Sequence, residues 1–352
     1  MKKIKKILAQ MRQEKLDALL VSSSANISYL TDYPSRDSWL LVSPKEQVFI
    51  TDSRYTQEAK KRLAGFTVSE INNSSAWSTI GGLCRALKIG CLGFEDRYLS
   101  YAEYTRIRKA IPKDTGFCPA SGMVEDLRQV KSGREIEKIR KALGITVAAF
   151  RFADKLLKPG MREIEVAGEL ERFIRFHGAR ASSFDMIVAS GPNSGFPHHL
   201  TSERKLKANE PVLIDMGVDY QGYKSDLTRV FFLGKIDTLT ARIYRIVLEA
   251  KKRAIAGIRP DVAAGQIDSL ARTYIEEKGF GKFFGHGLGH GVGLEVHEAP
   301  HIGKKQTTQL VPGMVFTVEP AIYLPHKFGM RLEDMVLVTG KGSEVLSGTL
   351  NQ

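Results

Sequence analysis

Short apolar runs alternate with helix-like segments over the first third of the chain. Strands are predicted at residues 16–21, 39–42, 47–51, 66–71 and 91–94, and helices at residues 55–63 and 101–111. A turn signal, Ser43-Pro44-Lys45, separates the second of these strands from the third. Because strands and helices alternate, the pattern predicts an α/β domain over residues 1–122.

Beyond residue 122 one order of elements occurs twice. The first round has a helix that begins with the capping-box form Ser132-Gly133-Arg134-Glu135 and ends at Pro159-Gly160. A second helix ending at Gly178, a strand at 184–189, a loop ending in Pro197-His198-His199 and a hairpin at 212–232 follow it. The second round has helices at residues 239–256 and 262–278, a histidine- and glycine-rich stretch, and strands at 315–323 and 330–338.

This repetition indicates an internal duplication within one α+β domain over residues 123–352. All eight histidines of the chain lie in this domain, the first of them at position 177. Chemistry that needs an imidazole must therefore come from it, and a site between the two halves would draw its ligands from both. The first domain is therefore expected to serve as a wall or lid of the site or as an oligomer contact.

The composition is that of an ordinary soluble globular protein. The 352 residues are 43% hydrophobic and 26% charged, and no apolar run reaches the 18 residues that a membrane span requires. Polar residues interrupt the apolar positions of the basic N-terminal segment, so it does not have the form of a signal peptide. The three cysteines lack CxxC spacing and favour neither a disulfide scaffold nor a cysteine zinc site. We expect a cytoplasmic protein with no membrane partner.

The net charge of +13 raises the alternative of a protein that binds nucleic acid. The basic residues, however, are scattered over helix-like segments and are not interleaved with aromatic residues, which is typical of solvated helix faces. We expect no nucleic-acid partner. A non-catalytic binding protein that uses this basic surface is kept as an alternative.

The stretch from Phe284 to Glu298, FGHGLGHGVGLEVHE, combines three histidines with regularly spaced glycines. Glycine makes it a poor helix, at a cost of about 1 kcal/mol per glycine relative to alanine. Glycine also lets a backbone approach a ligand closely, and imidazole is the commonest metal ligand and acid–base group near neutral pH. The stretch is therefore predicted to form one wall of an active site.

Two acids, Asp215 and Asp226, lie in strand-like sequence on either side of the turn signal Asp219-Tyr220-Gln221-Gly222. If Tyr220 and Gln221 form the loop, Asp215 faces Asp226 directly, with Cβ atoms about 5 Å apart. Two like charges at that distance are destabilising unless a cation neutralises them, and the apolar run before Asp215 disfavours solvation. The pair is predicted to bind a divalent metal, with two exposed strand acids as the alternative.

Glu319 and Glu333 are also embedded in apolar strand sequence. Together with two aspartates and a histidine they form a carboxylate-rich set, which suits hard or borderline divalent ions and can hold two of them. The set predicts a hydrolase in which two metal ions share a bridging hydroxide, a glutamate moves protons and neutral imidazoles stabilise an oxyanion.

At these residues the sequence resembles the pita-bread metallopeptidases, the family of methionine aminopeptidase, prolidase and aminopeptidase P. The resemblance covers residues 125–345, while the first domain resembles the N-terminal domain of prolidase, aminopeptidase P and creatinase. Five motifs occur in the family order: PHH, the hairpin from DMG to SDLTR, GHGLGHGVGLEVHE, VEP and RLED.

The resemblance implies a role for each residue that matches a family motif. The five implied metal ligands are Asp215, Asp226, His290, Glu319 and Glu333, with Asp226 and Glu333 bridging both ions. His198 would contact the substrate, His297 would stabilise the tetrahedral intermediate, and Glu319 would also shuttle protons. His286 is a candidate pocket wall, and Arg331 would orient a ligand carboxylate. Surface, loop or helix-end positions are expected for His177, His199, His301 and His326.

The resemblance further implies an Xaa-Pro peptidase, either an aminopeptidase or a dipeptidase, acting on proline-containing peptides. It implies two divalent metal ions, Mn²⁺ above Co²⁺, Zn²⁺ or Fe²⁺, and a homodimer. Because proline lacks an N–H and fixes φ, general aminopeptidases handle this bond poorly. A metal-free hydrolase of the creatinase type is the catalytic alternative, against which the complete ligand set argues.

Overall fold

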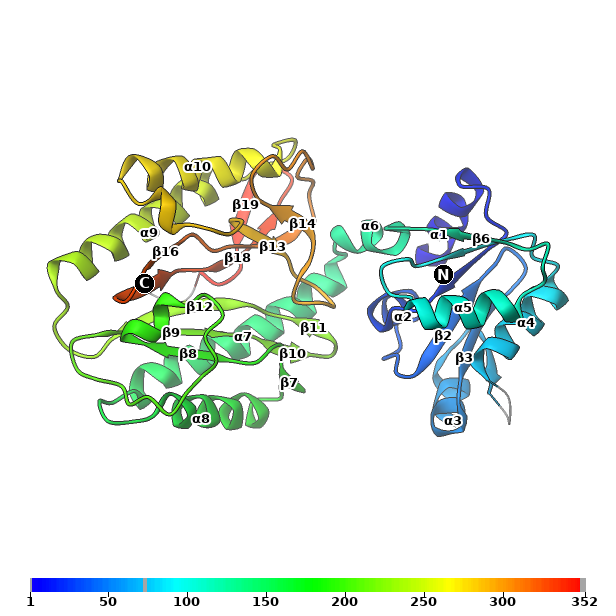
Figure 1. Cartoon of the computed structure of the whole chain (residues 1–352), viewed down its shortest axis with the longest axis horizontal. Coiled ribbons are helices and arrows are strands. Elements are labelled where there is room, and N and C mark those ends of the chain that lie inside the picture. Colours follow the sequence, from blue (N-terminus) through cyan, green and yellow to red (C-terminus); the bar gives the residue numbers. More distant parts are fainter. Residues whose placement is uncertain (1, 72–74, 349–352) are drawn as a thin grey trace. The chain divides into compact units, whose positions relative to one another are not determined.

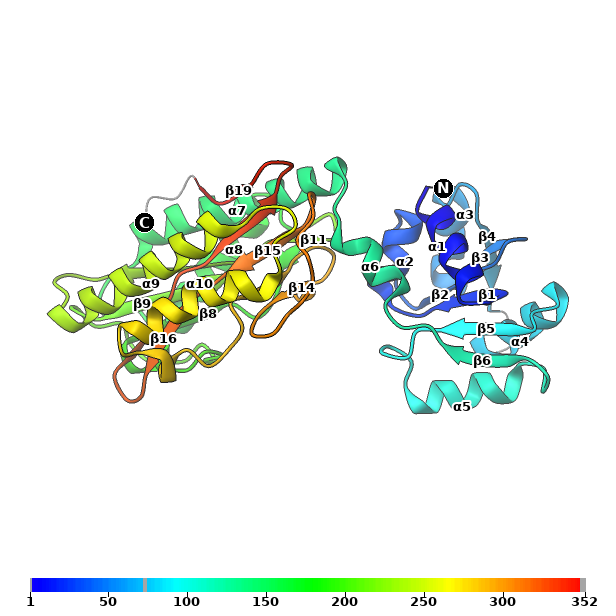
Figure 2. The same ribbon diagram turned by 90° about the horizontal axis from the view of Figure 1, so that it is seen from above.

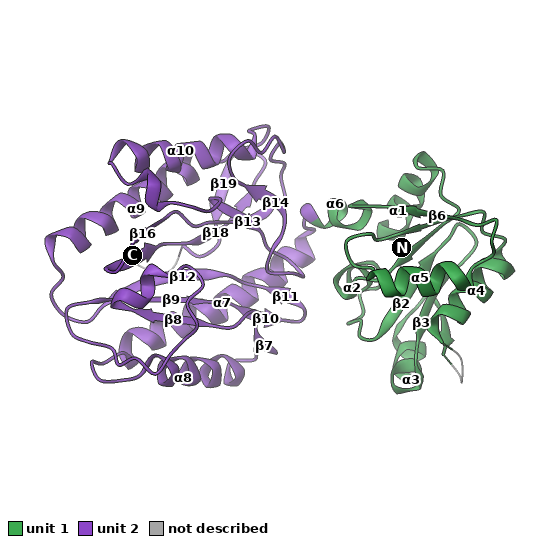
Figure 3. Cartoon of the chain, viewed as in Figure 1, with its two compact units in different colours: residues 1–128 green, residues 129–352 purple. Residues whose placement is uncertain are grey.

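The computed structural model of the chain describes residues 2–71 and 75–348. The chain divides into two compact units, residues 1–128 and 129–352 (Figure 3). The expected domain boundary between residues 122 and 123 coincides with the start of helix α6 (Met123–Gln129), which reaches the division between the units. Among the described helices, none combines the length and apolar character needed to cross a membrane.

The first unit is built on a mixed six-stranded sheet with strand order β4-β3-β2-β1-β5-β6 (Figure 1). Its strands are β1 (Ala18–Val21), β2 (Ser38–Val42), β3 (Gln47–Thr51), β4 (Thr67–Glu70), β5 (Cys91–Phe94) and β6 (Gly116–Pro119). Its helices are α1 (Lys2–Gln13), α2 (Ser24–Thr31), α3 (Ser53–Arg62), α4 (Ala76–Leu87) and α5 (Tyr101–Ala110). The α/β prediction is confirmed, and all five predicted strands are present.

Helix α4 was not predicted, because Gly81 and Gly82 make its sequence a poor helix former. Close packing of α4 against α5 explains the glycine at position 81. A Cβ atom at this position would lie 2.2 Å from the carbonyl oxygen of Ala110, so glycine allows α4 to pack closely against the end of α5. The three cysteines are free thiols, and the sulfurs of Cys91 and Cys118 on the neighbouring strands β5 and β6 lie 3.2 Å apart.

The second unit contains two rounds of helices followed by strands. The first round is α7 (Gly133–Leu156), α8 (Glu163–Phe176), β7 (Ala181–Ser182), β8 (Ile187–Ser190), the 3₁₀ helix η1 (Gly191–Gly195), β9 (Pro211–Met216), β10 (Val218–Tyr220), β11 (Tyr223–Lys224) and β12 (Leu227–Phe232). The second is α9 (Thr238–Gly257), α10 (Ala264–Glu277), the 3₁₀ helix η2 (Gly281–Phe283), β13 (Gly289–Gly291), β14 (Glu298–Ile302), β15 (Val315–Val318), β16 (Ala321–Leu324), β17 (Phe328–Arg331), β18 (Asp334–Val338) and β19 (Ser343–Val345).

Each pair of helices packs on the strands of its own half. Phe150 of α7 and Leu170 of α8 share a hydrophobic core with Ile214 in the sheet β12-β9-β8. Val247 of α9 shares a second core with Phe316 in the sheet β14-β13-β15-β18-β19. Figures 1 and 2 show α9 and α10 side by side in yellow and yellow-green. The expected helix pairs are therefore confirmed, and each covers one sheet.

The main-chain hydrogen bonds of the two halves repeat, which supports the inferred duplication. In the first half the Leu206 N–H donates to the carbonyl of Met161 at 2.8 Å, and in the second the Leu310 N–H donates to the carbonyl of Val262 at 2.9 Å. Antiparallel bridges join Arg162 to Lys205 and Ala263 to Gln309 in the same places. In both halves these main-chain hydrogen bonds fix the chain just before the second helix.

The predicted capping box at the start of α7 is present. The Glu135 carboxylate accepts hydrogen bonds from the Ser132 N–H at 2.8 Å and from the Ser132 hydroxyl at 2.5 Å. The carboxylate also accepts the Tyr223 hydroxyl at 2.9 Å. The cap therefore ties the first turn of α7 to the strand β11.

The predicted facing of Asp215 and Asp226 is wrong. Tyr220 pairs with Tyr223, so Gln221 and Gly222 form the turn, both with positive φ. The register carries through the hairpin, and Asp215 pairs with Thr228. Asp226 lies two positions away, which makes it a diagonal neighbour of Asp215 on the same face. A two-residue hairpin turn with positive φ at both positions favours glycine, which Gly222 supplies at the second position.

Two predicted strands are each broken at an acid. The expected strand 315–323 divides at Glu319-Pro320 into β15 and β16, which belong to different sheets. The expected strand 330–338 divides at Leu332-Glu333 into β17 and β18, again in different sheets. Proline cannot donate to a strand ladder, which explains the first break. At both positions the chain leaves one sheet and enters another, and the acid lies at the crossing.

Candidate metal centre

Four acids and one histidine from both halves of the second unit meet at one place. They are Asp215 in β9, Asp226 just before β12, His290 in β13, Glu319 just after β15 and Glu333 just before β18. Asp226 and Glu333 are 5% and 2% exposed. The structure thus brings together all five residues that were predicted to bind metal.

His290 lies between the acids of the two halves. Its Nε2 is 3.3 Å from Glu319 Oε1 and 3.6 Å from Asp226 Oδ2. Thr317 orients this corner: its hydroxyl accepts the His290 N–H at 3.1 Å and donates to Glu319 Oε1 at 3.1 Å. A Cβ atom at Gly289 would lie 1.9 Å from the Thr317 carbonyl oxygen, so glycine is required for β13 to approach β15 here.

Arg331 fixes the orientation of Asp215. Its Nη2 donates to Asp215 Oδ2 at 2.6 Å, its Nη1 donates to the Tyr323 hydroxyl at 2.5 Å, and its Nε donates to Thr228 Oγ1 at 3.2 Å. Arg331 and Tyr323 are both buried. Because the planar guanidinium has three well-oriented partners, it leaves one carboxylate oxygen of Asp215 facing the site.

Glu333 is held through both its side chain and its main chain. The Thr228 hydroxyl donates to Glu333 Oε2 at 2.7 Å, and the Glu333 N–H donates to the Thr228 carbonyl at 3.2 Å. Arg229 Nη1 donates to the Glu333 carbonyl oxygen. Hairpin residues of the first half therefore position an acid of the second.

The clustered acids repel one another in a buried setting. Burial, and then the charges of Glu333, Asp215 and Glu319, hold the pKa of Asp226 well above its usual range. Burial and the charges of Glu319 and Asp215 raise the pKa of Glu333 in the same way. Burial also raises the pKa of Asp215, although Arg331 opposes this. A cation at the centre would remove this repulsion.

The donor set fits divalent metal ions. Three groups of donors each have atoms within 4.8 Å of one another: Asp226, His290 and His297; His290, Glu319 and Glu333; and Asp215, Asp226 and Glu333. Asp215 Oδ1 is buried without a hydrogen-bond partner in the part of the chain that the structure describes, although a buried carboxylate oxygen needs one. Oxygen-rich sites with one imidazole suit hard or borderline divalent ions.

The centre lies in a cavity of about 970 Å³. His198, His286 and His297 all line this cavity. The His297 ring packs edge-on against His290 at 4.2 Å between centroids, and His286 Nε2 lies 3.2 Å from the Tyr323 hydroxyl. Partial burial and then the neighbouring His290 lower the pKa of His297, and burial lowers that of His286. Both rings therefore favour the neutral form near pH 7.

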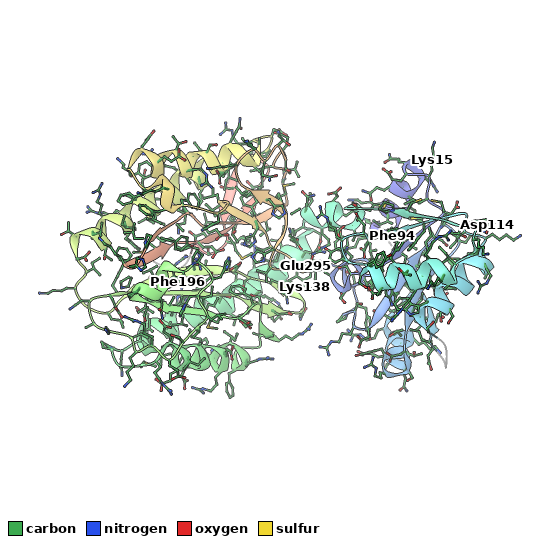
Figure 4. All side chains as sticks on the ribbon, in the orientation of Figure 1. Lys15, Phe94, Asp114, Lys138, Phe196 and Glu295 are labelled. Carbon is green, nitrogen blue, oxygen red and sulfur yellow. The ribbon has the colours of Figure 1, made fainter. Side chains whose placement is uncertain are left out.

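The loop that carries His198 forms an exposed part of the cavity rim. Its apolar side chains Phe196 and Leu200 are 64% and 82% exposed, and Figure 4 labels Phe196. His198 itself is exposed. His301 also lines the cavity, from the exposed face of β14, although it was expected to be a surface or loop residue only.

His199 lies in a loop, as expected, but its ring is turned inward. Its side chain is only 12% exposed, and its Nε2 lies 2.9 Å from Oε2 of the buried Glu163. His177 caps the end of α8 and stacks on Phe173, and His326 lies in an exposed turn, as expected of both. A Pro-His-His sequence does not show which of its two rings turns inward, because that depends on a carboxylate distant in sequence.

Sequence reasoning missed the hydroxyl groups that orient the acids: Thr228, Thr317 and Tyr323. Thr228 lies within the hairpin motif, and Thr317 and Tyr323 lie on either side of VEP, but hydroxyl residues are common in strands and carry no pattern of their own. A signal was available only for Thr317, which stands two residues before Glu319 and so shares its side of an extended chain.

The fold and the site together define a two-unit metal-dependent hydrolase. Residues 137–340 match the model of metallopeptidase family M24, and residues 3–130 match the creatinase/prolidase N-terminal domain. The chain belongs to metallopeptidase family M24.

Relatives and solved structures match the whole chain. An Xaa-Pro dipeptidase from Bacillus anthracis is similar with a TM-score of 0.96 and 39% identity, covering 100% of this chain and 98% of that one. An X-Pro aminopeptidase from Thermotoga maritima MSB8 is similar with a TM-score of 0.88 and 38% identity, covering 97% and 98%. An Xaa-Pro dipeptidase from Pyrococcus horikoshii is 35% identical over 99% of this chain and 97% of its own length.

Proposed function

We propose that the protein is a metal-dependent Xaa-Pro peptidase that hydrolyses the bond between an N-terminal residue and a following proline. The observation that carries the proposal is the convergence of four acids and His290 at the bottom of a histidine-lined cavity. Family membership and relatives that are named as Xaa-Pro dipeptidases and X-Pro aminopeptidases support the substrate class.

Asp215, Asp226, His290, Glu319 and Glu333 would hold two divalent ions, for which we propose Mn²⁺. When bound, the ions supply Lewis-acid activation of water and of the scissile carbonyl. Two observations support this ligand set. Asp215 Oδ1 is a buried oxygen without a hydrogen-bond partner, and burial with neighbouring acids raises the pKa values of Asp226 and Glu333. A bound cation would stabilise the ionised form of all three carboxylates. Arg331 would keep Asp215 in its ligating orientation.

Glu319 is suited to moving the proton. Burial raises its pKa, but the hydrogen bond and charge of His290 outweigh burial and lower it, so the carboxylate is ionised at neutral pH. It can therefore accept a proton from the attacking water and deliver it to the leaving prolyl nitrogen. That nitrogen carries no hydrogen in the peptide, so cleavage requires a donor.

The histidines of the cavity would bind the substrate. Neutral His297, with its lowered pKa, can donate a hydrogen bond to the oxyanion that forms at the carbonyl. His198 on the rim would contact the peptide, and His286 would form part of the pocket wall through its contact with Tyr323. A homodimer and a cytoplasmic location stay predictions from the sequence.

The test compares a dipeptide Xaa-Pro with a tripeptide Xaa-Pro-Yaa, each with and without Mn²⁺ after exhaustive chelation. We expect hydrolysis that is lost on chelation and restored by Mn²⁺, and the preferred peptide identifies a dipeptidase or an aminopeptidase. Full activity after chelation would contradict the metal-dependent proposal and favour the creatinase-type alternative.

A further inference from the structure

The second helix of each half carries one fully buried acid that bonds to the histidine-bearing segment of the same half. We propose that Glu163 of α8 and Asp268 of α10 are positioning residues: Glu163 fixes the loop with His198, and Asp268 fixes the segment from His286 to His290. The inference rests on the proposed function only for the roles of the histidines, because the bonds themselves are structural.

Glu163 closes the loop that carries His198 at both ends. It is the first residue of α8 and is fully buried. Its Oε1 accepts the N–H and the hydroxyl of Ser190, both at 2.7 Å, and its Oε2 accepts the hydroxyl and the N–H of Ser202 at 2.6 and 3.2 Å. Ser190 precedes the loop and Ser202 follows it. One carboxylate therefore holds the two ends of residues 191–201 together.

The same carboxylate also bonds inside the loop. Asn193 Nδ2 lies 3.1 Å from both oxygens of Glu163, and His199 Nε2 lies 2.9 Å from Oε2. His199 follows His198 directly in the sequence, so fixing the His199 ring restricts the backbone that carries His198. Burial raises the pKa of Glu163, but the bonds from Ser202, His199 and Ser190 outweigh it and lower the pKa. The group is thus an ionised acceptor whose partners all donate.

Asp268 holds the second segment through an ion pair. It is 1% exposed, and its two oxygens accept Nη2 and Nε of Arg272, both at 2.7 Å. Asp268 Oδ1 also accepts the Leu288 N–H at 3.1 Å. Arg272 in turn donates to the carbonyl oxygens of Phe284 and His286, at 3.0 and 2.7 Å. The pair therefore fixes three peptide groups on either side of His286.

The two acids are not equivalent positions of the duplication. Because the Arg162–Lys205 bridge of the first half matches the Ala263–Gln309 bridge of the second, Ala264 occupies the place of Glu163. Asp268 lies one helical turn further along. The two acids therefore occupy different positions of the repeated scaffold, so the duplication does not by itself explain why each half has one.

The two segments differ in what they carry, which makes the proposal testable. The Glu163 loop holds no residue of the five-ligand set. The segment held by Asp268 includes the proposed metal ligand His290, two residues beyond Leu288. The Leu288 carbonyl also accepts the Glu319 N–H at 2.8 Å. Loss of Glu163 should therefore disturb substrate turnover alone, while loss of Asp268 should also weaken metal binding.

The experiment uses Glu163→Gln and Asp268→Asn, which keep the side-chain shape but place an NH₂ group against donors. The half-buried Glu169→Gln on α8, whose carboxylate pairs with Arg172 of the same helix, and the exposed Glu277→Gln on α10 are matched controls. Three quantities are measured for each full-length variant: backbone hydrogen–deuterium exchange of residues 191–201 and 284–290, the dissociation constant for Mn²⁺ by calorimetry, and kcat and KM on an Xaa-Pro peptide.

For Glu163→Gln we expect exchange to rise about tenfold or more in residues 191–201 alone, as for the loss of a hydrogen bond to a charged group. Its kcat/KM should fall by a similar factor while the Mn²⁺ dissociation constant stays unchanged. For Asp268→Asn we expect faster exchange in residues 284–290 and Mn²⁺ binding weakened by about 10–100-fold, the range for partners that orient ligands. The controls should match the wild type.

Unchanged exchange in its own segment, or Mn²⁺ binding lost equally in both variants, would overturn the proposal. Exchange that rises uniformly over residues 129–352 would also overturn it, since that marks a general loss of stability.

If Glu163→Gln does not fold, His199→Leu removes one bond of the set and His199→Gln keeps a donor near the Nε2 position. We then expect the first to loosen residues 191–201 and the second to restore them. If the wild type hydrolyses no Xaa-Pro peptide, the proposed function fails while exchange and Mn²⁺ binding still decide this proposal.

Discussion

The two halves of residues 129–352 share a backbone scaffold but contribute different chemistry. The first half presents Asp215 and Asp226 on a hairpin whose register is uninterrupted. The second half presents Glu319 and Glu333 where the chain passes from one sheet to another, with His290 on a short strand between glycines. Duplication thus explains the frame, and local irregularity explains where the second half's ligands lie.

The halves also orient each other's acids. Arg331 of the second half donates to Asp215 of the first, and Thr228 of the first half donates to Glu333 of the second. Neither half could complete the site alone, because Asp215 and Glu333 each depend on a donor from the other half. The centre therefore depends on the interface between the halves.

The largest effect is expected from neutralising Asp226, a proposed ligand that lies near donors of both halves. Asp226→Asn should lower Mn²⁺ affinity and kcat/KM by more than about a hundredfold, which exceeds the usual effect of changing a residue that only orients a ligand. Without metal, the variant should be at least as stable as the wild type, because burial and the neighbouring acids already disfavour the Asp226 charge. Calorimetry, kinetics and thermal melting of the metal-free proteins measure these quantities.

Asn differs from Asp by one group, so the fold should be retained and the wild-type circular dichroism spectrum serves as the control. Retained Mn²⁺ affinity, or a metal-free variant that melts well below the wild type, would show that Asp226 serves the hairpin rather than the centre.

A smaller effect is expected from the glycines that let strands approach the ligands. Gly289→Ala places a methyl group 1.9 Å from the Thr317 carbonyl, and Gly217→Ala places one 1.8 Å from the Ser225 carbonyl, beside Asp226. Each should lower the free energy of unfolding by about 1–3 kcal/mol or more, as overpacking does. Gly285 has no atom within 4 Å of an added Cβ, so Gly285→Ala is the matched control.

Urea unfolding of these variants measures the change. We expect Gly285→Ala to stay within about 0.5 kcal/mol of the wild type, as for a surface substitution. Equal losses in all three variants would contradict the role of close backbone approach, which the structure shows at Gly289 and Gly217 but not at Gly285.

The smallest effect is expected at the helix starts, where the halves use different caps. Helix α7 begins after Ser132, and α9 begins after Asp237, whose side chain accepts the Thr240 N–H at 2.6 Å. Asp237→Ala should cost about 1 kcal/mol of unfolding free energy at pH 7. Hydrogen bonds from Thr240 lower the pKa of Asp237, so its contribution is present above the unfolded pKa and is lost as pH falls through the folded pKa.

Urea unfolding at pH 7 and pH 3 measures this dependence. Asp237→Asn should cap α9 equally well at both values, because asparagine does not titrate and ranks beside aspartate as a cap. Ser132→Ala, at the first half's cap, is the comparison. An Asp237→Ala loss that is as large at pH 3 as at pH 7 would show that the charge of Asp237 is not involved.

Much of the fold could be predicted because its determinants are local. The capping box at Ser132 and the glycines and prolines that end helices act over a few residues, and the predicted helices and most strands are present. The failures were non-local. Helix α4 tolerates Gly81 only because α5 packs against it, and the division at Glu333 has no proline to mark it.

The candidate site shows the same division. Residue type and motif order pointed to the five donors, since acids within apolar runs and histidines among glycines are unusual without a ligand. The partners of those donors could not be predicted, because Thr228, Tyr323 and Glu163 act through contacts with residues distant in sequence. The inward turn of the His199 ring could not be predicted for the same reason, because it depends on Glu163.

The sequence by itself determined the chemistry of this protein: which side chains can bind metal, which helices form, and that one order of elements occurs twice. Only the tertiary structure decided the geometry. The Gln221–Gly222 turn set the register that moves Asp226 diagonal to Asp215, and the passage between sheets set Glu319 and Glu333 facing them. The physical reason is that composition and periodicity act along the chain, whereas charge repulsion, close backbone approach and hydrogen-bond partners depend on which segments meet in space.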